Sequence, residues 1–397
     1  MRDKRIIVSC IPVLNKEQQN GMKNLLLDLQ QQGCKVYFWS QNKYESLSDF
    51  YIVPYYKKAR VRIFVYQLIV KLFVDRKKWV SRLTKWLGTD YRDSNERYNI
   101  FSKEAIALFS TIEPDLFICW NPYCCQFGIA FDIARVLGIS TSAIEWGFLP
   151  NTFILDEKGT LASSQIFNCN PLKGKSDEDM QRYFYEGEKI FDTLKNSSLS
   201  LYNQNNVVFP IGVDNDREGV FKVLLLGIDE VDSGAFPREH RERHGLLPFH
   251  ESSLQTAKAF AEADSAFQVI YKPHPSHNEY FENVKVLKNL WIVNGNPDQL
   301  IGWADVIVCS GSKMEFSALL KNKPLINVGA GLLYKKGCSY EIESSSQIAE
   351  CVKVACYNNV SDLQLLSFKQ FLGFLKLDYL YSTKDRNREI TAKLMIK

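Results

Sequence analysis

Short apolar runs alternate with amphipathic stretches along most of the chain, and this alternation constrains its fold more than any other feature. Residues 5–12 and 35–40 have the pattern of strands, and residues 15–33 between them have that of a helix ending at Gly33. A strand, a helix and a strand in this order form a parallel pair, because the helix crosses back over the sheet. The chain therefore begins as an α/β unit.

The same alternation resumes in two longer series. The first series alternates helix and strand, with predicted elements at 102–112, 115–120, 126–138 and 140–146. The second series has predicted strands at 220–227, 267–272, 290–294, 305–310 and 324–329, with helices at 253–263, 297–303 and 313–322. These series predict an α/β fold with two Rossmann-like halves, joined by a polar, turn-rich segment at 201–219. We expect a ligand-binding cleft between the halves.

The predicted domains follow from these boundaries. An N-terminal Rossmann-like domain takes residues 1–210, a C-terminal one takes 211–355, and residues 356–397 form helices that pack back on the N-terminal domain. With 397 residues, 46 % of them hydrophobic, the chain is long enough for two cores. Domain closure over a ligand is expected from the returning helices.

Composition excludes several classes of protein. A charged content of 24 % and an aromatic content of 13 % fit neither a disordered nor a fibrous chain. The net charge of +4 is too small to indicate nucleic-acid binding, so no nucleic-acid partner is expected. The ten cysteines lack the paired spacing of a zinc site. The N-terminal apolar run is too short for a signal peptide, and no stretch reaches membrane-spanning length, which predicts a cytoplasmic location.

An insertion at about residues 55–88 breaks the regular pattern. It contains one acidic residue, Asp75, and ten basic ones: Lys57, Lys58, Arg60, Arg62, Lys71, Arg76, Lys77, Lys78, Arg82 and Lys85. The pattern predicts one or two basic amphipathic helices, and two interpretations stay open. The helices contact an anionic membrane surface or a lipid-carried polymer. Alternatively, their apolar face packs on the N-terminal domain and their charges are solvated.

The segment KPHP follows the predicted strand at 267–272. Pro273 and Pro275 fix the backbone on both sides of His274, which holds the imidazole at the carboxyl end of the strand. His274 is thereby placed to donate a hydrogen bond to a phosphate oxygen of a nucleotide sugar, and Lys272 adds positive charge. A structural turn histidine is the alternative.

A second polar segment, SGSKMEF, lies where the strand at 305–310 gives way to a helix. Ser310, Gly311 and Ser312 are expected to offer hydroxyl and backbone N–H groups to a phosphate at the start of that helix. Glu315 in its first turn either accepts a ribose hydroxyl or acts as a capping-box carboxylate.

Acidic residues follow two other predicted strands. Glu145 ends the strand at 140–146 just before a turn, where it is either a catalytic carboxylate or part of a buried salt bridge. Asp229, Glu230 and Asp232 lie on the loop after the strand at 220–227. Carboxylates at such strand ends suit glycosyl chemistry, because they stabilise or attack an oxocarbenium-like transition state.

Together these four segments resemble the β-Kdo transferases of bacterial capsule and O-antigen assembly, which use CMP-Kdo and have paired Rossmann domains like those of bacterial sialyltransferases. The resemblance spans about residues 143–329 and rests on EWGFLPNTFILDEKG (E-x-G-x-L-P and D-x-x-G), GIDEVD (G-x-x-x-x-D), KPHP (His-Pro) and SGSKMEF (S-x-S). Ile228 follows Gly227 where capsule members often have glutamine, which favours an O-antigen type. A GT-B-like fold with a C-terminal helix crossing back is implied, with an acceptor-side N-terminal domain and a CMP-sugar-binding C-terminal domain.

The resemblance also implies a retaining mechanism. Asp232 would attack the anomeric carbon of Kdo, and Glu145 would deprotonate the acceptor hydroxyl. No metal or cofactor is then expected, and the partners would be CMP-Kdo and a lipid-linked or soluble oligosaccharide, with peripheral contact at the inner face of the inner membrane. The residues expected to bind the CMP moiety are Lys272, His274, Pro275, Ser310, Gly311, Ser312 and Glu315.

Two other functions stay open: a sialyltransferase-like enzyme with another CMP-sugar, and a non-catalytic polysaccharide-binding domain. His240 and His244 are four residues apart, as helical metal ligands are, but they do not form a His-Glu-x-x-His motif. Their neighbours Arg238, Arg241 and Arg243 either face solvent or meet the carboxylate of the donor sugar.

Overall fold

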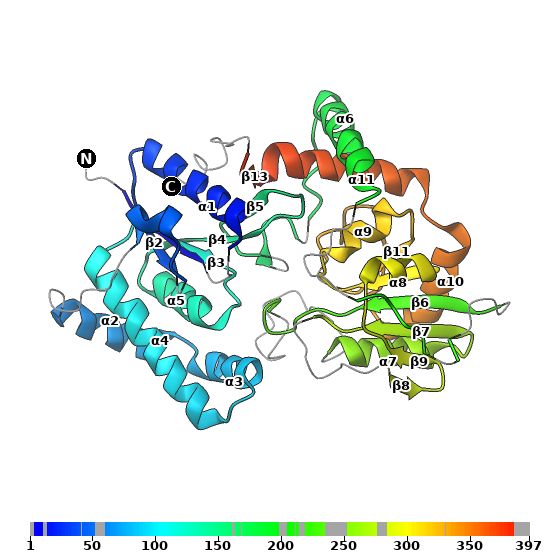
Figure 1. Ribbon diagram of the computed structural model, residues 1–397, viewed down its shortest axis with the longest axis horizontal. Coiled ribbons are helices and arrows are strands. Elements are labelled where there is room, and N and C mark those ends of the chain that lie inside the picture. The colour runs from blue at the N-terminus through cyan, green and yellow to red at the C-terminus, as the bar shows by residue number, and fades with distance from the viewer. Residues whose placement is uncertain are drawn as a thin grey trace. The chain divides into compact units, whose positions relative to one another are not determined.

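The computed structural model shows two compact α/β units (Figure 1). The first comprises Met1–Thr160 and Asp378–Lys397, and the second comprises Leu161–Leu377. Within them the structure describes residues 4–10, 14–40, 42–51, 60–160, 163–167, 169–197, 205–210, 212–213, 219–234, 252–275, 284–329 and 331–384.

The first unit is built on a sheet with the strand order β13-β5-β4-β3-β1-β2. Four strands pair in parallel: β1 (Arg5–Cys10), β2 (Lys35–Ser40), β3 (Leu116–Trp120) and β4 (Ser140–Trp146). Two more add antiparallel pairs at one edge: β5 (Thr152–Asp156) and β13 (Leu380–Ser382). The connecting helices are α1 (Lys16–Gln31), α4 (Tyr91–Ile112) and α5 (Cys125–Val136). The predicted parallel arrangement is confirmed.

Local sequence explains where the first helix begins and ends. The Asn15 side chain accepts a hydrogen bond from the Gln18 backbone N–H, and the Gln18 side chain accepts one from the Asn15 backbone N–H, at 2.9 Å each. This reciprocal capping box satisfies two of the N–H groups that a helix start leaves open. Gly33 follows α1 with a φ of 81°, a left-handed conformation that favours glycine.

The basic insertion forms two helices, α2 (Arg60–Phe73) and α3 (Arg76–Leu87), which contact α4 and α5. The expectation that their charges are solvated is wrong for two residues. Lys78 is buried and donates to Asp132 at 3.3 Å, and Arg82 is fully buried, with its guanidinium 5.0 Å from the Trp79 ring centroid. These cations are buried because an acid and an aromatic ring lie beside them. Lys57 and Lys58 lie outside the described residues.

The second unit contains the other sheet, with the order β12-β11-β10-β6-β7-β9-β8. Its parallel strands are β6 (Phe221–Leu226), β7 (Phe267–Lys272), β9 (Leu290–Ile292), β10 (Val306–Cys309), β11 (Leu325–Asn327) and β12 (Tyr340–Glu341), and β8 (Val284–Leu287) is antiparallel to β9. Apolar side chains of the central strands pack with those of α7 (Ser253–Ala263) and α10 (Ile348–Asn358) in one core. Two shorter helices, α8 (Pro297–Trp303) and α9 (Met314–Leu320), complete this Rossmann-like unit.

Two helices distant in sequence, α6 (Asp177–Leu194) and α11 (Asp362–Phe374), pack against each other in the second unit. Glycines permit the close approach: a Cβ at Gly187 would lie 1.6 Å from the Lys369 carbonyl oxygen, and one at Gly373 would lie 1.9 Å from that of Tyr183. The predicted domain limits therefore differ from the observed division, because the α6–α11 contact places residues 161–210 in the second unit.

The chain returns to the first unit only at its end. After a π-helical segment, Leu375–Tyr379, β13 joins β5 as the outermost strand of the first sheet. The Tyr381 hydroxyl donates to Asp28 of α1 at 2.7 Å, and the Tyr379 hydroxyl donates to Asp156 at 2.8 Å. Two Rossmann-like units form a GT-B-like fold, as predicted. The element that returns to the first unit is the strand β13 and not the predicted helix, because α11 packs on α6 within the second unit.

Candidate functional site

Three neighbouring strands of the second sheet carry most of the predicted site residues at their carboxyl ends. The strand β6 lies between β10 and β7, and all three are parallel. In the observed register, Leu226 of β6 is level with Cys309 of β10 and with Lys272 of β7. The loops that follow these strands therefore leave the sheet at one edge, which is where open α/β sheets bind ligands.

The end of β7 presents a buried lysine. Lys272 is only 5 % exposed, and its Nζ makes one hydrogen bond within the described part of the chain, to the Pro273 carbonyl oxygen at 3.2 Å. Burial lowers the pKa of Lys272 to about 8. His274 follows and is half-buried, and Pro275 is the last described residue of this loop. An ammonium with so few partners is suited to an anionic ligand.

The end of β10 presents a buried hydroxyl. Ser310 is 5 % exposed, and its Oγ has no hydrogen-bond partner among the described residues. Gly311 follows with a φ of 90°, so the chain turns there in a conformation that a side chain would strain. A buried polar atom without a partner costs free energy unless a ligand or water satisfies it.

The start of α9 differs from the predicted phosphate seat. The Ser312 hydroxyl accepts from the Met314 N–H at 3.2 Å, and the Ser312 carbonyl accepts from the Glu315 N–H at 3.1 Å. These N–H groups are therefore occupied within the protein. The Ser310 hydroxyl, in contrast, has no hydrogen-bond partner among the described residues.

Glu315 does not form the capping box that the sequence suggested. It is 1 % exposed, and its Oε1 accepts a hydrogen bond from the Leu332 N–H at 2.7 Å in the loop after β11. Burial raises the pKa of Glu315 to about 8. A Cβ at Gly331 would lie 2.3 Å from its Oε2, so only glycine fits between the carboxyl group and the loop. The observed contact is structural, and ribose binding by Glu315 stays a prediction.

The loop after β6 gives different environments to its three acids. Asp229 Oδ1 accepts from the N–H groups of Val231 and Asp232 at 3.0 and 2.9 Å, and so stabilises a tight turn. Glu230 is buried, and its Oε1 accepts from the Ser253 N–H at the start of α7 at 3.2 Å. Asp232 is half-buried. Two of the acids are thus used to shape the loop.

Sequence reasoning missed Ser233, the next residue of this loop. Its side chain is buried, and its Oγ lacks a hydrogen-bond partner within the described ranges. Ser233 and Ser310 therefore follow adjacent parallel strands, and each has an unsatisfied hydroxyl. The signal was the position of Ser233 directly after the acidic cluster, but a serine in a loop is too common to be noticed without its burial.

The remaining predicted acid, Glu145, lies in the first unit at the carboxyl end of β4, where it pairs with Ile154 of β5. The adjacent Gly147 allows a tight hairpin, because a Cβ there would lie 1.9 Å from the Thr152 hydroxyl oxygen. In the D-x-x-G part of the motif, Asp156 is fully buried and its Oδ1 accepts from the N–H groups of Lys158 and Gly159. That part of the motif therefore has a structural role.

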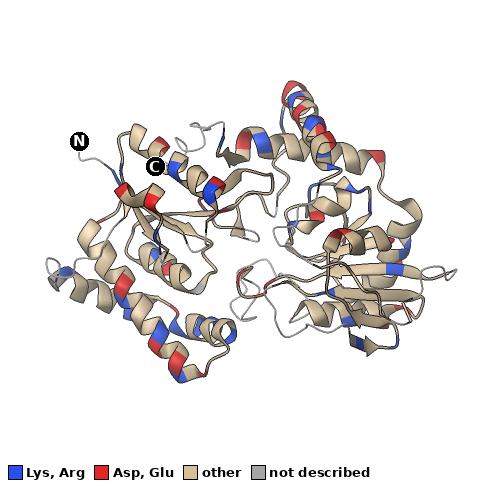
Figure 2. Ribbon diagram, in the orientation of Figure 1, with Lys and Arg blue, Asp and Glu red and all other residues tan. Residues whose placement is uncertain are grey.

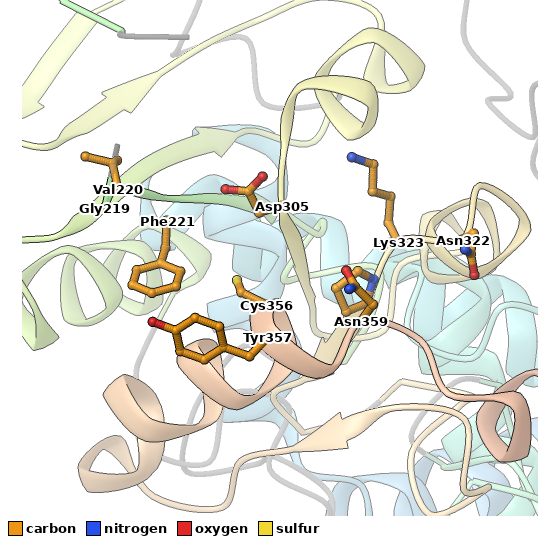
Figure 3. Close-up of a pocket in the computed structure, with 10 residues that line it drawn as sticks. Gly219, Val220, Phe221, Asp305, Asn322, Lys323, Cys356, Tyr357 and Asn359 are labelled. Carbon is orange, nitrogen blue, oxygen red and sulfur yellow. The ribbon is translucent and has the colours of Figure 1, made fainter. Parts of the chain in front are cut away.

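A pocket of about 440 Å³ lies at the opposite, amino end of the second sheet (Figure 3). Its lining comes from residues that precede or begin β6, β10 and β11 and from the end of α10. The Lys323 Nζ donates to the Ala304 carbonyl at 2.6 Å, and Asp305 accepts from the Lys222 N–H at 2.9 Å. These charged groups are already hydrogen-bonded, so we do not place the site there.

No cluster of three or more His, Cys, Asp or Glu side chains that could hold a metal ion occurs among the described residues. His240, His244 and the arginines beside them lie outside those residues, so their predicted roles stay open. In the part of the chain that the structure describes, no helix combines the length and hydropathy needed to span a bilayer.

No protein-family model and no curated protein sequence matches the chain. Among solved structures, it is similar to the KpsC β-Kdo 2,4 transferase of Thermosulfurimonas dismutans, with 19% identity, a TM-score of 0.42 and coverage of 65% of this chain and 78% of that one. The KpsC β-Kdo 2,7 transferase of the same organism has 15% identity, a TM-score of 0.43 and coverage of 73% and 89%. The spinosyn rhamnosyltransferase SpnG has 12% identity, a TM-score of 0.32 and coverage of 99% and 100%. Likenesses this distant identify neither the reaction nor the substrates of this chain.

Proposed function

We propose that this chain is a retaining glycosyltransferase that moves Kdo from CMP-β-Kdo to an O-antigen-type polysaccharide. The observation that carries the proposal is a pair of buried donors with few or no hydrogen-bond partners, Lys272 Nζ at the end of β7 and Ser310 Oγ after β10. These two strands lie on either side of β6. A phosphate accepts hydrogen bonds and carries negative charge, so it would satisfy both groups. We identify this anion as the phosphate of CMP because the four motifs resemble those of β-Kdo transferases.

The proposed first step is attack by the Asp232 carboxylate on the anomeric carbon of Kdo. The bond from that carbon to the phosphate oxygen breaks, and its electron pair leaves with CMP, whose charge is held by Lys272, His274 and Ser310. Asp232 is chosen as the nucleophile because it is the acid of the G-x-x-x-x-D motif, whereas Asp229 and Glu230 accept backbone hydrogen bonds that shape the loop.

In the proposed second step, an acceptor hydroxyl displaces the aspartate from the anomeric carbon. Glu145 takes the hydroxyl proton, and two inversions give net retention. No step requires a metal or a cofactor, because CMP is a good leaving group once its charge is held. The assignment of Glu145 as the base rests on its motif and on its position at the end of β4.

The proposed acceptor is a lipid-linked or soluble oligosaccharide. For a lipid-linked acceptor, the enzyme would work in the cytoplasm at the inner face of the inner membrane. Sialyltransferase-like activity would appear as transfer from CMP-sialic acid instead of CMP-Kdo, and a non-catalytic binding domain would turn over neither donor.

The test is transfer from CMP-Kdo to a synthetic oligosaccharide by the native protein and by Asp232→Asn and His274→Ala. Removal of a nucleophile costs roughly 10³-fold or more in rate, and removal of a charge-holding donor costs roughly 10²-fold. Glu230→Gln serves as a matched control, because it keeps an oxygen for the Ser253 N–H. Equal rates for all four proteins would overturn the site assignment.

A second measurement tests the double-displacement mechanism independently of whether Kdo is transferred. Intact-mass analysis of a Glu145→Gln variant incubated with CMP-Kdo should show a Kdo adduct, because the slowed second step lets the intermediate accumulate. The adduct should be absent when Asp232→Asn is combined with Glu145→Gln. Transfer without any adduct would contradict double displacement and leave the donor assignment intact.

A further inference from the structure

The helix α2 exposes a row of large apolar side chains. Five of them are between 45 % and 69 % exposed: Phe64, Val65, Leu68, Leu72 and Phe73. Consecutive helical residues are about 100° apart, so the first four fall within an arc of roughly 100°. The opposite side of the helix is buried through Val70. We call the five exposed residues the α2 apolar face.

A face of this kind calls for a partner. Single exposed apolar residues are normal in proteins, but several in a row on one helix mark an interaction surface. The neighbouring helix α3 shows the contrast, because Trp79, Val80 and Leu83 are all fully buried. In α2, by contrast, most of the large apolar side chains are exposed, and Val70 is the buried one among those described.

The charges around the α2 apolar face are positive. Lys71 is exposed on one side of the arc, and Arg62 lies on the other side, where it pairs with Glu113. Residues 60–87 contain eight basic residues, of which Lys78 and Arg82 are buried. Their one acid, Asp75, caps α3 by accepting from the Lys78 N–H at 3.0 Å. Figure 2 shows where the charged residues of α2 and α3 lie along the ribbon. Apolar residues bordered by basic ones are complementary to the surface of an anionic bilayer.

We propose that the α2 apolar face inserts into the interfacial region of an anionic phospholipid membrane, with Lys71 and Lys77 contacting the lipid headgroups. This deepens the peripheral membrane contact of the proposed function by naming the surface that makes it. Apolar insertion supplies affinity, and the basic residues supply the preference for anionic lipid. The bound chain and a lipid-linked acceptor would then both be confined to the membrane surface.

The test is cosedimentation of the full chain with vesicles of phosphatidylglycerol and phosphatidylcholine in equal parts, compared with pure phosphatidylcholine. We expect binding to the mixed vesicles that weakens as salt is added, and at least tenfold weaker binding to pure phosphatidylcholine. The combined Phe64→Ser, Leu68→Ser and Leu72→Ser variant should lose at least tenfold of its affinity for the mixed vesicles.

A matched control places the same change elsewhere: Val354→Ser, Leu363→Ser and Leu366→Ser alter exposed apolar residues of α10 and α11 and should leave vesicle binding unchanged. If the α2 variant proves unstable, Lys71→Glu provides a second test and should weaken binding roughly fivefold or more. Both α2 variants should still transfer Kdo to a soluble acceptor. Vesicle binding is measured without a sugar substrate. A failure to bind vesicles is therefore distinguishable from a failure of the transferase proposal.

Three results would overturn the proposal. The native chain fails to sediment with mixed vesicles, the α2 variant sediments as the native chain does, or pure phosphatidylcholine binds equally well. Sedimentation velocity tests the alternative partner of the α2 apolar face, which is a second copy of the chain. A dimer abolished by the α2 substitutions, without vesicle binding, would assign the face to self-association and contradict the membrane proposal.

Discussion

The two ends of the second sheet differ: one has a cavity, and the other has buried polar groups with few hydrogen bonds. At the amino end, an open pocket is bordered by Tyr357, which is 74 % exposed, and by Lys323, whose Nζ already donates to two carbonyls. At the carboxyl end, Lys272 has one hydrogen bond and the Ser310 hydroxyl has none within the described residues. We therefore place the proposed site where buried polar groups have incomplete hydrogen bonds and not at the cavity.

This difference has a physical reason. A protein gains nothing by burying a donor without a partner, so such groups persist where a ligand repays the cost. The Lys323 ammonium stabilises the fold by bonding the chain between α8 and β10, whereas burial of Lys272 costs stability. The comparison predicts that substitutions at the carboxyl end weaken ligand binding, and that matched substitutions at the amino end weaken the fold.

The largest effect is expected from the two lysines. Lys272→Met should lower CMP affinity by roughly 10- to 100-fold, because it removes a charge-assisted hydrogen bond to phosphate. It should also raise the melting temperature, because a buried ammonium is replaced by an apolar group. Lys323→Met should leave CMP affinity unchanged and lower the melting temperature. Calorimetric titration measures the CMP affinity, and thermal unfolding measures the melting temperature. If Lys323→Met lost CMP affinity and Lys272→Met did not, the site would lie at the amino end of the sheet.

The pH dependence of binding sharpens the assignment of Lys272. Its pKa is lowered to about 8 by burial, and a bound phosphate favours the charged form. Above that pH, CMP binding should therefore take up a proton, and affinity should fall by about tenfold per pH unit. Near pH 7 the lysine is already protonated, so no uptake by this group is expected. Titration in buffers of different ionisation enthalpy measures the uptake, which should disappear in Lys272→Met.

A smaller effect is expected from the two serines of the β10 loop. Ser310→Ala should lower CMP affinity roughly fivefold, for one lost hydrogen bond, and should leave stability unchanged or slightly raised. Ser312→Ala removes the bond to the Met314 N–H and should destabilise the protein by about 1 kcal/mol. An equal loss of CMP affinity in both variants would mean that the start of α9 binds the phosphate, as the sequence predicted.

The smallest effect concerns Glu315. Its pKa in the folded protein is raised to about 8 by burial, so folding favours the protonated form. Stability from this group is complete below the unfolded pKa of about 4.3 and is lost as pH rises toward the folded pKa. Glu315→Gln should therefore melt a few degrees higher than the native protein at pH 8, with the difference vanishing near pH 4. If Glu315 instead binds ribose, the variant should bind CMP more weakly.

Much of the α/β core could be predicted from the sequence. The bounds of β2, β4 and β7 agree with the predicted strands, because continuous apolar runs with turn residues on both sides leave little choice. The helix α6 was missed because its surface is strongly charged, as Figure 2 shows. The strand β13 was missed because it pairs with β5, and its partners are more than 200 residues away along the chain.

The site was harder to predict than the fold. Loops after neighbouring parallel strands could be expected to carry its residues, which is how Lys272, Ser310 and Asp232 were identified. Burial and hydrogen-bond partners cannot be read from a motif, so Ser312 and Glu315 were grouped with them although their observed contacts are structural. The same limit applies to the basic insertion, because its sequence does not show that α3 buries its large apolar residues while α2 exposes most of its own.

The most direct test of the central claim is amide hydrogen exchange of the native protein with and without CMP. If the carboxyl end of the second sheet binds the nucleotide, exchange should slow at Lys272, at His274 and at residues 310–315. It should stay unchanged at residues 219–221 and 356–359. Slowing confined to the amino-end pocket, or no slowing at saturating CMP, would contradict the account.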